Sequence, residues 1–338
     1  MKISVIGCGG WGLAVSTLLN GNGHDVTVWC FLKEEYELLN NTRGNEKLLP
    51  GIKLDEKIKL TMDLSCASGS DIVVVAVPSF AVYSTAVNLR PFISKDQVIV
   101  LLSKGFDKSN GYCLLSKSLE KALEGNGRIV ALTGPSHAEE VSRRVPTAVV
   151  AASCDREAAE KVQGAFMNGF FRVYTHDDIV GAELGGAMKN IMALAVGISD
   201  GAGYGDNTKA MIMTRGIAEM SRFGEYLGGR KETFAGLSGV GDLIVTCISQ
   251  HSRNRRAGLM IGAGEKPDEA VKKVGAVVEG YFATEAVHFL AAESGIELPI
   301  SEAMYNLLFE GASLEKVEES LISRSGKPEF WAGNGTEK

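Results

Sequence analysis

The sequence predicts an α/β protein in which a doubly wound sheet is followed by an all-helical domain. In the first half, short β-branched runs alternate with helix-length segments, and after residue 177 they give way to Ala-, Gly-, Met- and Leu-rich stretches with helical spacing. The chain has 338 residues, which exceeds the size at which one hydrophobic core usually stops growing. Two domains are therefore expected.

The predicted strands are short and rich in Val and Ile. Residues 72–77 are apolar throughout, as expected for a strand covered by helices on both faces of a parallel sheet. Strands are expected at residues 2–6, 25–29, 57–61, 71–77, 97–102, 128–132, 147–152 and 171–174. We assign residues 1–176 to the sheet domain, 177–324 to the helical domain and 325–338 to a poorly ordered tail. Glycine-rich loops at 201–205 and 236–241 should interrupt the helices.

The composition argues against several classes of protein. Lys and Arg number 35 against 41 Asp and Glu, a formal net charge of −6, so the chain lacks the cationic surplus that binding to nucleic acid usually needs. With 45% hydrophobic and 22% charged residues, most of the chain should fold. The six cysteines and five histidines show no metal-ligand spacing, which predicts no metal site and favours a reducing, cytoplasmic location.

One uncharged stretch, residues 3–24, superficially resembles a signal peptide or a membrane span. A spanning helix needs about 20 predominantly apolar residues. This stretch instead contains six glycines and two asparagines and divides into a β-branched run and a glycine cluster. We therefore expect no membrane span there.

A glycine-rich turn follows the first predicted strand. Gly7, Gly9 and Gly12 have the GxGxxG spacing between that strand and an amphipathic helix. Gly7 would permit a tight turn, Gly9 the close approach of a pyrophosphate, and Gly12 the close packing of helix on strand. The free N–H groups of the helix N-terminus would then point at the anion. The first domain is therefore predicted to be Rossmann-type and to bind NAD or NADP.

The choice between NAD and NADP stays open. An acidic residue at the end of the second strand would select the 2′-hydroxyl of NAD, and an arginine would suit the 2′-phosphate of NADP. Residues 29–33 contain neither. Phe31, within this segment, either stacks on the adenine or is an ordinary hydrophobic residue.

Two loops follow strands at the edge where open parallel sheets bind their ligands. Lys104 comes after the strand that ends at residue 102, and would either aim its ammonium at this crevice or be a solvated loop lysine. Gly134 and Ser136 follow the next strand. The alternative for Ser136 is a helix capping box with Glu139.

Lys189 lies in a predicted buried helix. Its neighbours on the same helix face are Gly185, Gly186 and Ala193, a lane of small residues that would leave room for a ligand. A desolvated lysine has a lowered pKa and can exchange a proton with a substrate oxygen near neutral pH. The alternative is close helix packing against the lane, with Lys189 reaching out to water.

A helix that opens with three arginines within four residues is the most unusual segment. Ser252 is a natural N-cap, and Arg253 and Asn254 follow in the first turn. Cations there face the positive end of the helix dipole, an interaction whose sign a bound phosphate would reverse. The alternative is pairing of the arginines with acids elsewhere. Upstream, Asp242 is predicted either to cap a helix or to accept hydrogen bonds from substrate hydroxyls and the lysine.

Taken in order, these segments resemble the NAD(P)-dependent glycerol-3-phosphate dehydrogenase family, of the soluble bacterial type, over nearly the whole chain. The resemblance implies reduction of dihydroxyacetone phosphate to sn-glycerol 3-phosphate, which supplies glycerophospholipid synthesis. A homodimer is a candidate assembly that the sequence does not decide. The motifs that carry the resemblance are residues 7–12, 103–105, 134–136, 185–190, 239–242, 252–256 and 278–280.

The resemblance also implies roles for individual residues. Lys189 would be the catalytic acid/base. The residues around the substrate would be Lys104, Gly134, Ser136, Lys189, Asp242, Ser252, Arg253 and Asn254. Besides Gly7, Gly9 and Gly12, the cofactor would contact Gly10, Trp11, Phe31, Lys104, Ala138, Arg253, Val277 and Glu279. Phe31 departs from the family, which often has His or Arg there, so the resemblance indicates no preference for NADPH.

Two other functions remain compatible with the sequence. Another two-domain carbonyl reductase, of the 3-hydroxyacid or ketopantoate type, would share the nucleotide domain and a helical lysine, but would not explain the helix that opens with arginines. A non-catalytic NAD(P)-sensing module would use Lys189 only structurally. The substrate and the turnover separate the three functions.

Overall fold

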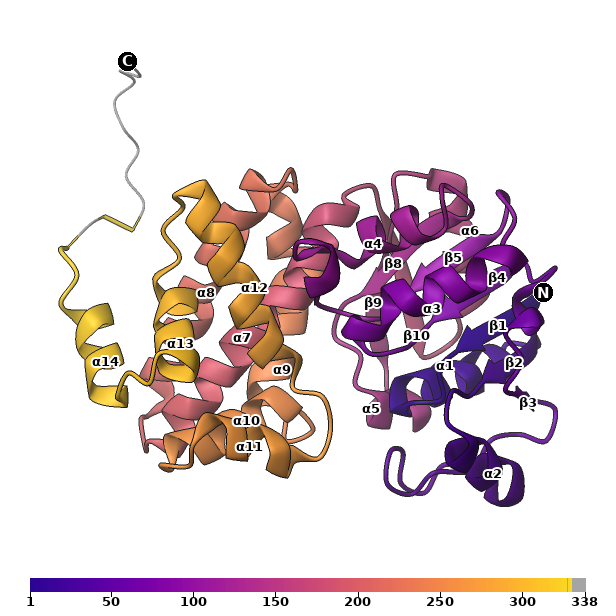
Figure 1. The fold of residues 1–338 in the computed structure, drawn as a ribbon, viewed down its shortest axis with the longest axis horizontal. Coiled ribbons are helices and arrows are strands. Elements are labelled where there is room, and N and C mark those ends of the chain that lie inside the picture. The colour runs from indigo at the N-terminus through magenta and orange to yellow at the C-terminus, as the bar shows by residue number, and fades with distance from the viewer. Residues whose placement is uncertain (327, 330–338) are drawn as a thin grey trace, which may run out of the picture.

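The fold is described from a computed structural model, in which residues 1–326 and 328–329 are described. Figure 1 shows two lobes side by side, a sheet covered by helices and an all-helical lobe. Of the tail predicted to be poorly ordered, residues 327 and 330–338 lie outside the described residues.

The first lobe is built on an eight-stranded sheet with the order β10-β9-β8-β5-β4-β1-β2-β3. The runs predicted as strands are strands, with small differences at their ends. Their bounds are β1 (Lys2–Ile6), β2 (Asp25–Trp29), β3 (Lys59–Thr61), β4 (Ile72–Val75), β5 (Val98–Leu101), β8 (Arg128–Thr133), β9 (Thr147–Ala152) and β10 (Phe171–His176). A small hairpin of β6 (Phe106–Asp107) and β7 (Cys113–Leu114) was not predicted, because two-residue strands carry no periodicity.

The sheet differs from the prediction at one edge. Six strands are parallel, but β9 pairs antiparallel with β8, and β10 follows the direction of β9. A parallel connection needs a crossover that returns along the whole strand. The helix between β8 and β9, α5 (Ala138–Ser142), has only five residues. The chain therefore turns back and enters β9 in the opposite direction.

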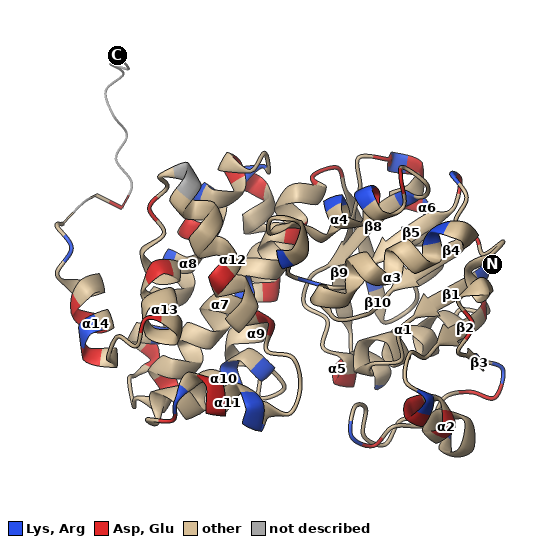
Figure 2. Ribbon diagram, viewed as in Figure 1, with Lys and Arg blue, Asp and Glu red and all other residues tan. Residues whose placement is uncertain are grey.

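Helices cover both faces of the sheet because successive strand residues point to opposite sides. On one face, Val5 and Val74 belong to a buried cluster with residues of α1 (Gly10–Gly21) and α6 (Arg156–Phe166). On the other face, Ile6 and Val75 pack with residues of α3 (Val82–Leu89) and α4 (Leu115–Ala122). A further helix, α2 (Lys33–Thr42), follows β2. Figure 2 shows few charged residues on the strands and many on the surrounding helices and loops.

The uncharged N-terminal stretch forms most of β1 and all of α1, so it is part of the sheet lobe. In the described residues, one helix is long and apolar enough to cross a membrane, α7 (Ile179–Gly201). However, 89% of its most apolar window is buried inside the protein. This helix is therefore the core of the second lobe.

Five of the other helices of the second lobe contact α7, and the remaining two pack mainly against those helices (Figure 1). Their bounds are α8 (Asp206–Tyr226), α9 (Asp242–Ile248), α10 (Arg253–Gly262), α11 (Pro267–Val274), α12 (Glu279–Ser294), α13 (Pro299–Phe309) and α14 (Leu314–Ile322). Of the two predicted glycine loops, the first connects α7 and α8. The second prediction is wrong in part, because Leu237–Gly241 is a π-helical turn that leads into α9.

Glycines bring α7 and α10 into main-chain contact. A Cβ at Gly197 of α7 would collide with the carbonyl oxygen of Arg255, and one at Gly258 of α10 would collide with that of Leu194. Because no side chain fits between the helices, their crossing is held close. The start of α10 consequently lies beside the middle of α7, where Asn254 bonds to Asn190.

Candidate active site

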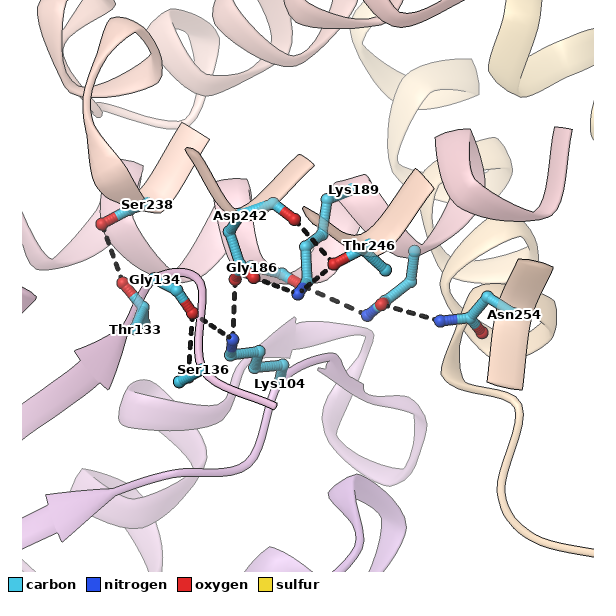
Figure 3. A network of polar contacts seen from close by, with 11 residues as sticks. Lys104, Thr133, Gly134, Ser136, Gly186, Lys189, Ser238, Asp242, Thr246 and Asn254 are labelled. Atoms are coloured by element: carbon cyan, nitrogen blue, oxygen red, sulfur yellow. Dashed lines mark hydrogen bonds and ion pairs between the residues drawn. The ribbon is translucent and has the colours of Figure 1, made fainter. Parts of the chain in front are cut away.

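The two lobes meet at a buried charge cluster (Figure 3). Lys189 lies in the middle of α7, Asp242 is the first residue of α9, and Lys104 follows β5. One oxygen of Asp242 accepts a hydrogen bond from Lys189 Nζ, and the other accepts one from Lys104 Nζ at 2.6 Å. One carboxylate from the helical lobe therefore binds two lysines, one from each lobe.

Burial excludes a solvated position for either lysine. The side chain of Lys189 is 8% exposed, so it does not reach out to water, and that of Lys104 is 18% exposed, so it is not a solvated loop lysine. Asp242, 1% exposed, is the first residue of α9 and directs its carboxylate to the lysines. Of the two predicted roles for Asp242, the structure favours the acceptor over the helix cap.

The cluster sets the protonation of its own members. Burial lowers the pKa of Lys189 to about 7; Asp242 acts against this lowering and Lys104 adds to it. Burial favours the neutral form of Asp242, but the charges of Lys104 and Lys189 outweigh it and lower the pKa of Asp242. Near neutral pH, Asp242 is therefore an anion while Lys189 exchanges between ammonium and amine. A group with such a pKa suits general acid–base chemistry.

The lane of small residues beside Lys189 does not leave room for a ligand, so that prediction is wrong. A Cβ at Gly185 would collide with the carbonyl oxygen of Ser238, because the turn before α9 packs on this glycine. A Cβ at Gly186 would lie 3.4 Å from the stem of Lys104. The glycines instead let Lys104 and the start of α9 approach α7 closely enough to form the cluster.

The loop after β8 lies on the sheet side of the cluster (Figure 3). The carbonyl oxygen of Gly134 accepts hydrogen bonds from Lys104 Nζ at 3.2 Å and from Ser136 Oγ at 2.9 Å. The capping box of Ser136 and Glu139 is not formed, because α5 begins at Ala138 without a side-chain cap. Ser136 therefore belongs to the loop at the cluster.

The start of α10 is held in place by its N-cap and by a buried asparagine. Ser252 is the N-cap, as predicted, and its Oγ accepts from the N–H of Arg255 at 3.2 Å. Asn254 is buried and bonds to Asn190 of α7 and to the N–H of Gly280, both at 2.8 Å. It therefore ties three helices together.

The arginines of this helix differ in their surroundings. Arg255 pairs with Asp200 at 2.6 Å, so for this residue the structural alternative holds. Arg253 is exposed, and no ion pair to it is found in the described part of the chain. Its guanidinium, near the free N–H groups of α10, is available to an anion.

The glycine turn fits a dinucleotide. Gly7 has a φ of +121°, and a Cβ there would lie 2.6 Å from the carbonyl oxygen of Ala76. A Cβ on Gly12 would collide with the carbonyl oxygen of Gly7, so the fold itself requires both glycines. A Cβ on Gly9, in contrast, would meet nothing within 4 Å. Gly9 caps α1 without a side chain, so open space lies above free N–H groups, as a pyrophosphate needs.

The remaining residues predicted to contact the cofactor come from both lobes. Phe31 follows β2 and is 72% exposed, which favours an available stacking surface over an ordinary core residue. Trp11 and Ala138 are half-buried against the core cluster on the α1 face. Gly10 faces the carbonyl oxygen of Leu48, 2.8 Å from where its Cβ would lie.

From the helical lobe, Val277 is half-buried just before α12, and Glu279 is the first residue of that helix. Burial raises the pKa of Glu279, and hydrogen bonds from Ser79 partly offset this. Ser79 Oγ donates to Glu279 at 2.7 Å, just beyond β4, so Glu279 lies at the carboxyl edge of the sheet.

Comparisons with known proteins show the family to which the chain belongs. Residues 2–159 match the family model described as NAD-dependent glycerol-3-phosphate dehydrogenase N-terminus, and residues 178–319 match the model of its C-terminus. The chain belongs to the NAD-dependent glycerol-3-phosphate dehydrogenase family. A glycerol-3-phosphate dehydrogenase (NAD(P)+) from Fusobacterium nucleatum is 46% identical to this dehydrogenase over 98% of this chain and 99% of the relative.

Solved structures show the same relationship. A glycerol-3-phosphate dehydrogenase from Coxiella burnetii is 35% identical, with a TM-score of 0.91 over 95% of this chain and 98% of that one. A ketopantoate reductase from Ralstonia eutropha, 16% identical with a TM-score of 0.61, covers 95% of this chain and 100% of its own. At that identity it shares the fold alone.

The site of this family member also contains residues that the sequence analysis did not single out. Thr246, one turn after Asp242 in α9, accepts from Lys189 Nζ at 2.8 Å and donates to the Asp242 carbonyl oxygen at 2.6 Å. The i, i+4 spacing of Asp242 and Thr246 is the signal that would have found it. Ser79 follows a strand and carries the same positional signal as Lys104.

Glu183 of α7 is a further unpredicted group of this dehydrogenase. One of its oxygens accepts from the N–H of Ser116 at 2.9 Å, at the start of α4 in the sheet lobe, and the other is buried without a hydrogen-bond partner. Burial raises the pKa of Glu183 to about 7. Nothing in the local sequence signals this contact, because it depends on how the lobes dock. In the described residues, no three His, Cys, Asp or Glu side chains gather to hold a metal ion.

Proposed function

We propose that this enzyme reduces dihydroxyacetone phosphate to sn-glycerol 3-phosphate reversibly, with NADH or NADPH. The observation that carries the proposal is Lys189, a buried lysine with a pKa of about 7 at the junction of the two lobes. The names of the relatives support the same substrate and cofactors. The segment after β2 contains no residue that would select one cofactor over the other.

Lys189 is the catalytic acid/base in this proposal. Bound nicotinamide supplies a hydride to C2 of the ketone or accepts it in reverse. As the C–H bond forms, the carbonyl π-electrons move to the oxygen, which takes a proton from the Lys189 ammonium. Lys189 is left as the neutral amine. In the oxidation direction the amine removes the hydroxyl proton while the hydride leaves C2.

Asp242 and Lys104 act in opposite directions on the pKa of Lys189. Asp242, with Thr246, orients Nζ and favours its charged form, whereas the charge of Lys104 opposes it. Lys104 also borders the substrate together with Gly134 and Ser136, which lie on the sheet side of the cluster. Burial, together with these opposing charges, places the pKa of Lys189 at about 7.

Arg253 binds the substrate phosphate in this proposal. It is exposed in the first turn of α10, where Ser252 caps the helix and Asn254 anchors it to α7 and α12. Phosphate binding at one end and proton transfer at the other would fix the carbonyl for hydride transfer.

The cofactor-binding residues are proposed on the same basis. Gly9 and the start of α1 hold the pyrophosphate, and Phe31 stacks on the adenine. The other residues proposed at the cofactor are Gly7, Gly10, Trp11, Gly12, Lys104, Ala138, Arg253, Val277 and Glu279. Residues 1–176 would thus bind the nucleotide and 177–324 would provide the acid/base. We also propose a cytoplasmic enzyme that supplies glycerophospholipid synthesis, with a homodimer as its candidate assembly.

An assay with three arms tests the function. Purified protein is mixed with NADH or NADPH and dihydroxyacetone phosphate, and the loss of reduced-nicotinamide absorbance is followed. The proposal requires turnover that depends on the phosphorylated ketone. Turnover with unphosphorylated ketoacids instead would indicate a ketopantoate or 3-hydroxyacid type of reductase. Cofactor binding without turnover on any ketone would indicate a sensor.

A further inference from the structure

His137 has an unsatisfied nitrogen at the junction of the lobes. It follows Ser136 directly and is the residue that precedes α5. The Nε2 atom of its half-buried ring is buried and has no hydrogen-bond partner. A buried polar atom without a partner is costly, so each such atom in a native structure needs an explanation, such as a bound water, an ion or a functional role.

The surroundings of His137 place it near both ends of the proposed substrate site. Its ring faces that of His251 at a centroid distance of 6.0 Å and an angle of 54°. His251 directly precedes the N-cap of α10, and its Nδ1 lies 4.0 Å from the Glu139 carboxylate. The charges that act on His137 are those of Lys189, Glu139, Asp242 and Lys104. His137 therefore lies beside the residue that precedes the N-cap of α10, and the charges of the cluster act on it.

The surroundings of His137 disfavour its protonated form. Burial lowers the pKa of His137, and Lys189 and Lys104 lower it further, whereas Glu139 and Asp242 act in the opposite direction. His251 is the other titratable group that faces the ring. A neutral imidazole has one nitrogen that donates and one that accepts. An arriving anion would favour the imidazolium, in which both nitrogens donate.

We infer that His137 is a further substrate-binding residue, whose Nε2 donates a hydrogen bond to a phosphate oxygen of the bound substrate. The inference rests on the proposed function, because it takes the substrate to be a phosphate ester. It explains why a polar ring nitrogen is buried unpaired beside the start of α10. Binding of the phosphate dianion raises the proton affinity of His137, so substrate binding is coupled to proton uptake.

Two variants separate the hydrogen bond from the proton. His137→Phe keeps a ring but removes both nitrogens, and His137→Gln keeps a donor that cannot be protonated. KM and kcat for dihydroxyacetone phosphate are measured with saturating reduced cofactor from pH 6.5 to 8.5. We expect His137→Phe to raise KM about tenfold or more with a smaller effect on kcat, the range for a hydrogen bond to a charged group. His137→Gln should keep part of the affinity but flatten the rise of KM with pH.

Calorimetry tests the same contact without turnover. Inorganic phosphate is titrated into the protein saturated with oxidised cofactor, in buffers of different ionisation enthalpy, which reports proton uptake. We expect the wild type to take up a fraction of a proton that His137→Gln does not. His24→Gln is the matched control, because His24 is half-buried at the start of β2, bonded to the Ala165 carbonyl oxygen, and should behave as wild type.

The outcomes distinguish this inference from the proposed function. An unchanged KM in a folded His137→Phe, or the same proton uptake in His137→Gln as in the wild type, overturns the role of His137. A KM effect without any proton uptake would mean that the nitrogen contacts a hydroxyl, which also contradicts the inference. If the wild type does not reduce dihydroxyacetone phosphate but His137-dependent proton uptake on phosphate persists, the proposed function fails and the phosphate contact stands.

Discussion

Asp242 of α9 binds Lys189 of α7. One of its carboxylate oxygens accepts a hydrogen bond from Lys189 Nζ, and the other accepts one from Lys104 Nζ. Asp242, in the helical lobe, therefore orients the Lys189 amine, and Lys104, in the sheet lobe, lowers its pKa. Removing either lysine or the carboxylate changes the charge that the other members experience, so these residues should not behave additively on mutation.

Replacing Lys189 by Met should abolish most of the turnover while the nucleotide still binds. Met keeps the stem in its buried position but removes the proton, and loss of a general acid typically costs about 10²- to 10⁴-fold. Stopped-flow turnover and titration of protein fluorescence with NADH measure the two effects. An equal loss of turnover and NADH affinity would show that Lys189 serves the fold instead of the reaction.

The pH dependence should reverse between the two reaction directions. Because the pKa of Lys189 is about 7, the acid needed for reduction is lost as pH rises through 7, and the base needed for oxidation appears over the same interval. Lys104→Met removes a charge that lowers this pKa, so the falling limb of the reduction rate should move to higher pH. The pH profile of the reduction rate at saturating substrate measures this shift. A falling limb at the same pH in Lys104→Met as in the wild type would contradict the effect of Lys104 on the pKa of Lys189.

Arg253 and Arg256 form a matched pair in one helix turn. Both are exposed, but only Arg253 is proposed to bind phosphate. Arg253→Ala should raise the KM for dihydroxyacetone phosphate by about 10- to 150-fold, the equivalent of about 1.5–3 kcal/mol for a charge-assisted hydrogen bond. Arg256→Ala should leave KM within about twofold, the effect of an exposed substitution. Equal effects would indicate only a general loss of positive charge.

Gly9→Ala should weaken nucleotide binding without destabilising the fold. Its Cβ would meet nothing in the protein and would occupy the space proposed for the pyrophosphate. Gly164 of α6 also has nothing within 4 Å of its Cβ position, so Gly164→Ala is the control for the same chemical change. NADH titration and thermal unfolding of both variants provide the comparison. Unchanged NADH affinity in Gly9→Ala would remove the pyrophosphate from this turn.

Glu183→Gln should make the protein less sensitive to alkaline pH. The pKa of Glu183 is raised to about 7 in the folded state, so the wild type is most stable below the ordinary pKa and loses stability as pH rises through 7. Gln still accepts from the N–H of Ser116 and cannot ionise. Urea unfolding at pH 5 and pH 8 should show a relative gain of up to about 3 kcal/mol for the variant at pH 8. No difference between the two pH values would contradict the raised pKa.

Much of the fold was predictable because its signals are local. Apolar β-branched runs such as residues 72–77 indicate buried strands, and the glycine spacing after β1 indicates the turn that α1 requires. The reversed direction of β9 was not predictable from periodicity. It follows from the five residues of α5, whose length becomes informative only when the path of the chain is known.

The candidate site was predictable in its residue types and less so in its contacts. Lys104, Lys189 and Asp242 stood out as polar residues at strand ends or in apolar surroundings, but their mutual contact joins segments up to 138 residues apart. Gly185 and Gly186 suggested space, whereas the structure fills that space with the chain itself. A small residue shows that something lies close, and the sequence does not tell whether this is a ligand or the protein.

The main-chain contact of α7 with α10 fixes the distance between the backbones of these two helices. Because carbonyl groups and glycines meet there, no side-chain rearrangement between the helices can change the spacing of their backbones. In the proposed complex, the ketone carbon of the substrate lies at Lys189 on α7 and its phosphate lies at Arg253 on α10. The backbone positions of these two residues are therefore fixed relative to each other. If Lys189 and Arg253 bind the substrate as proposed, a substrate lengthened by one methylene would have to be accommodated by these two side chains, because the backbones that carry them cannot separate.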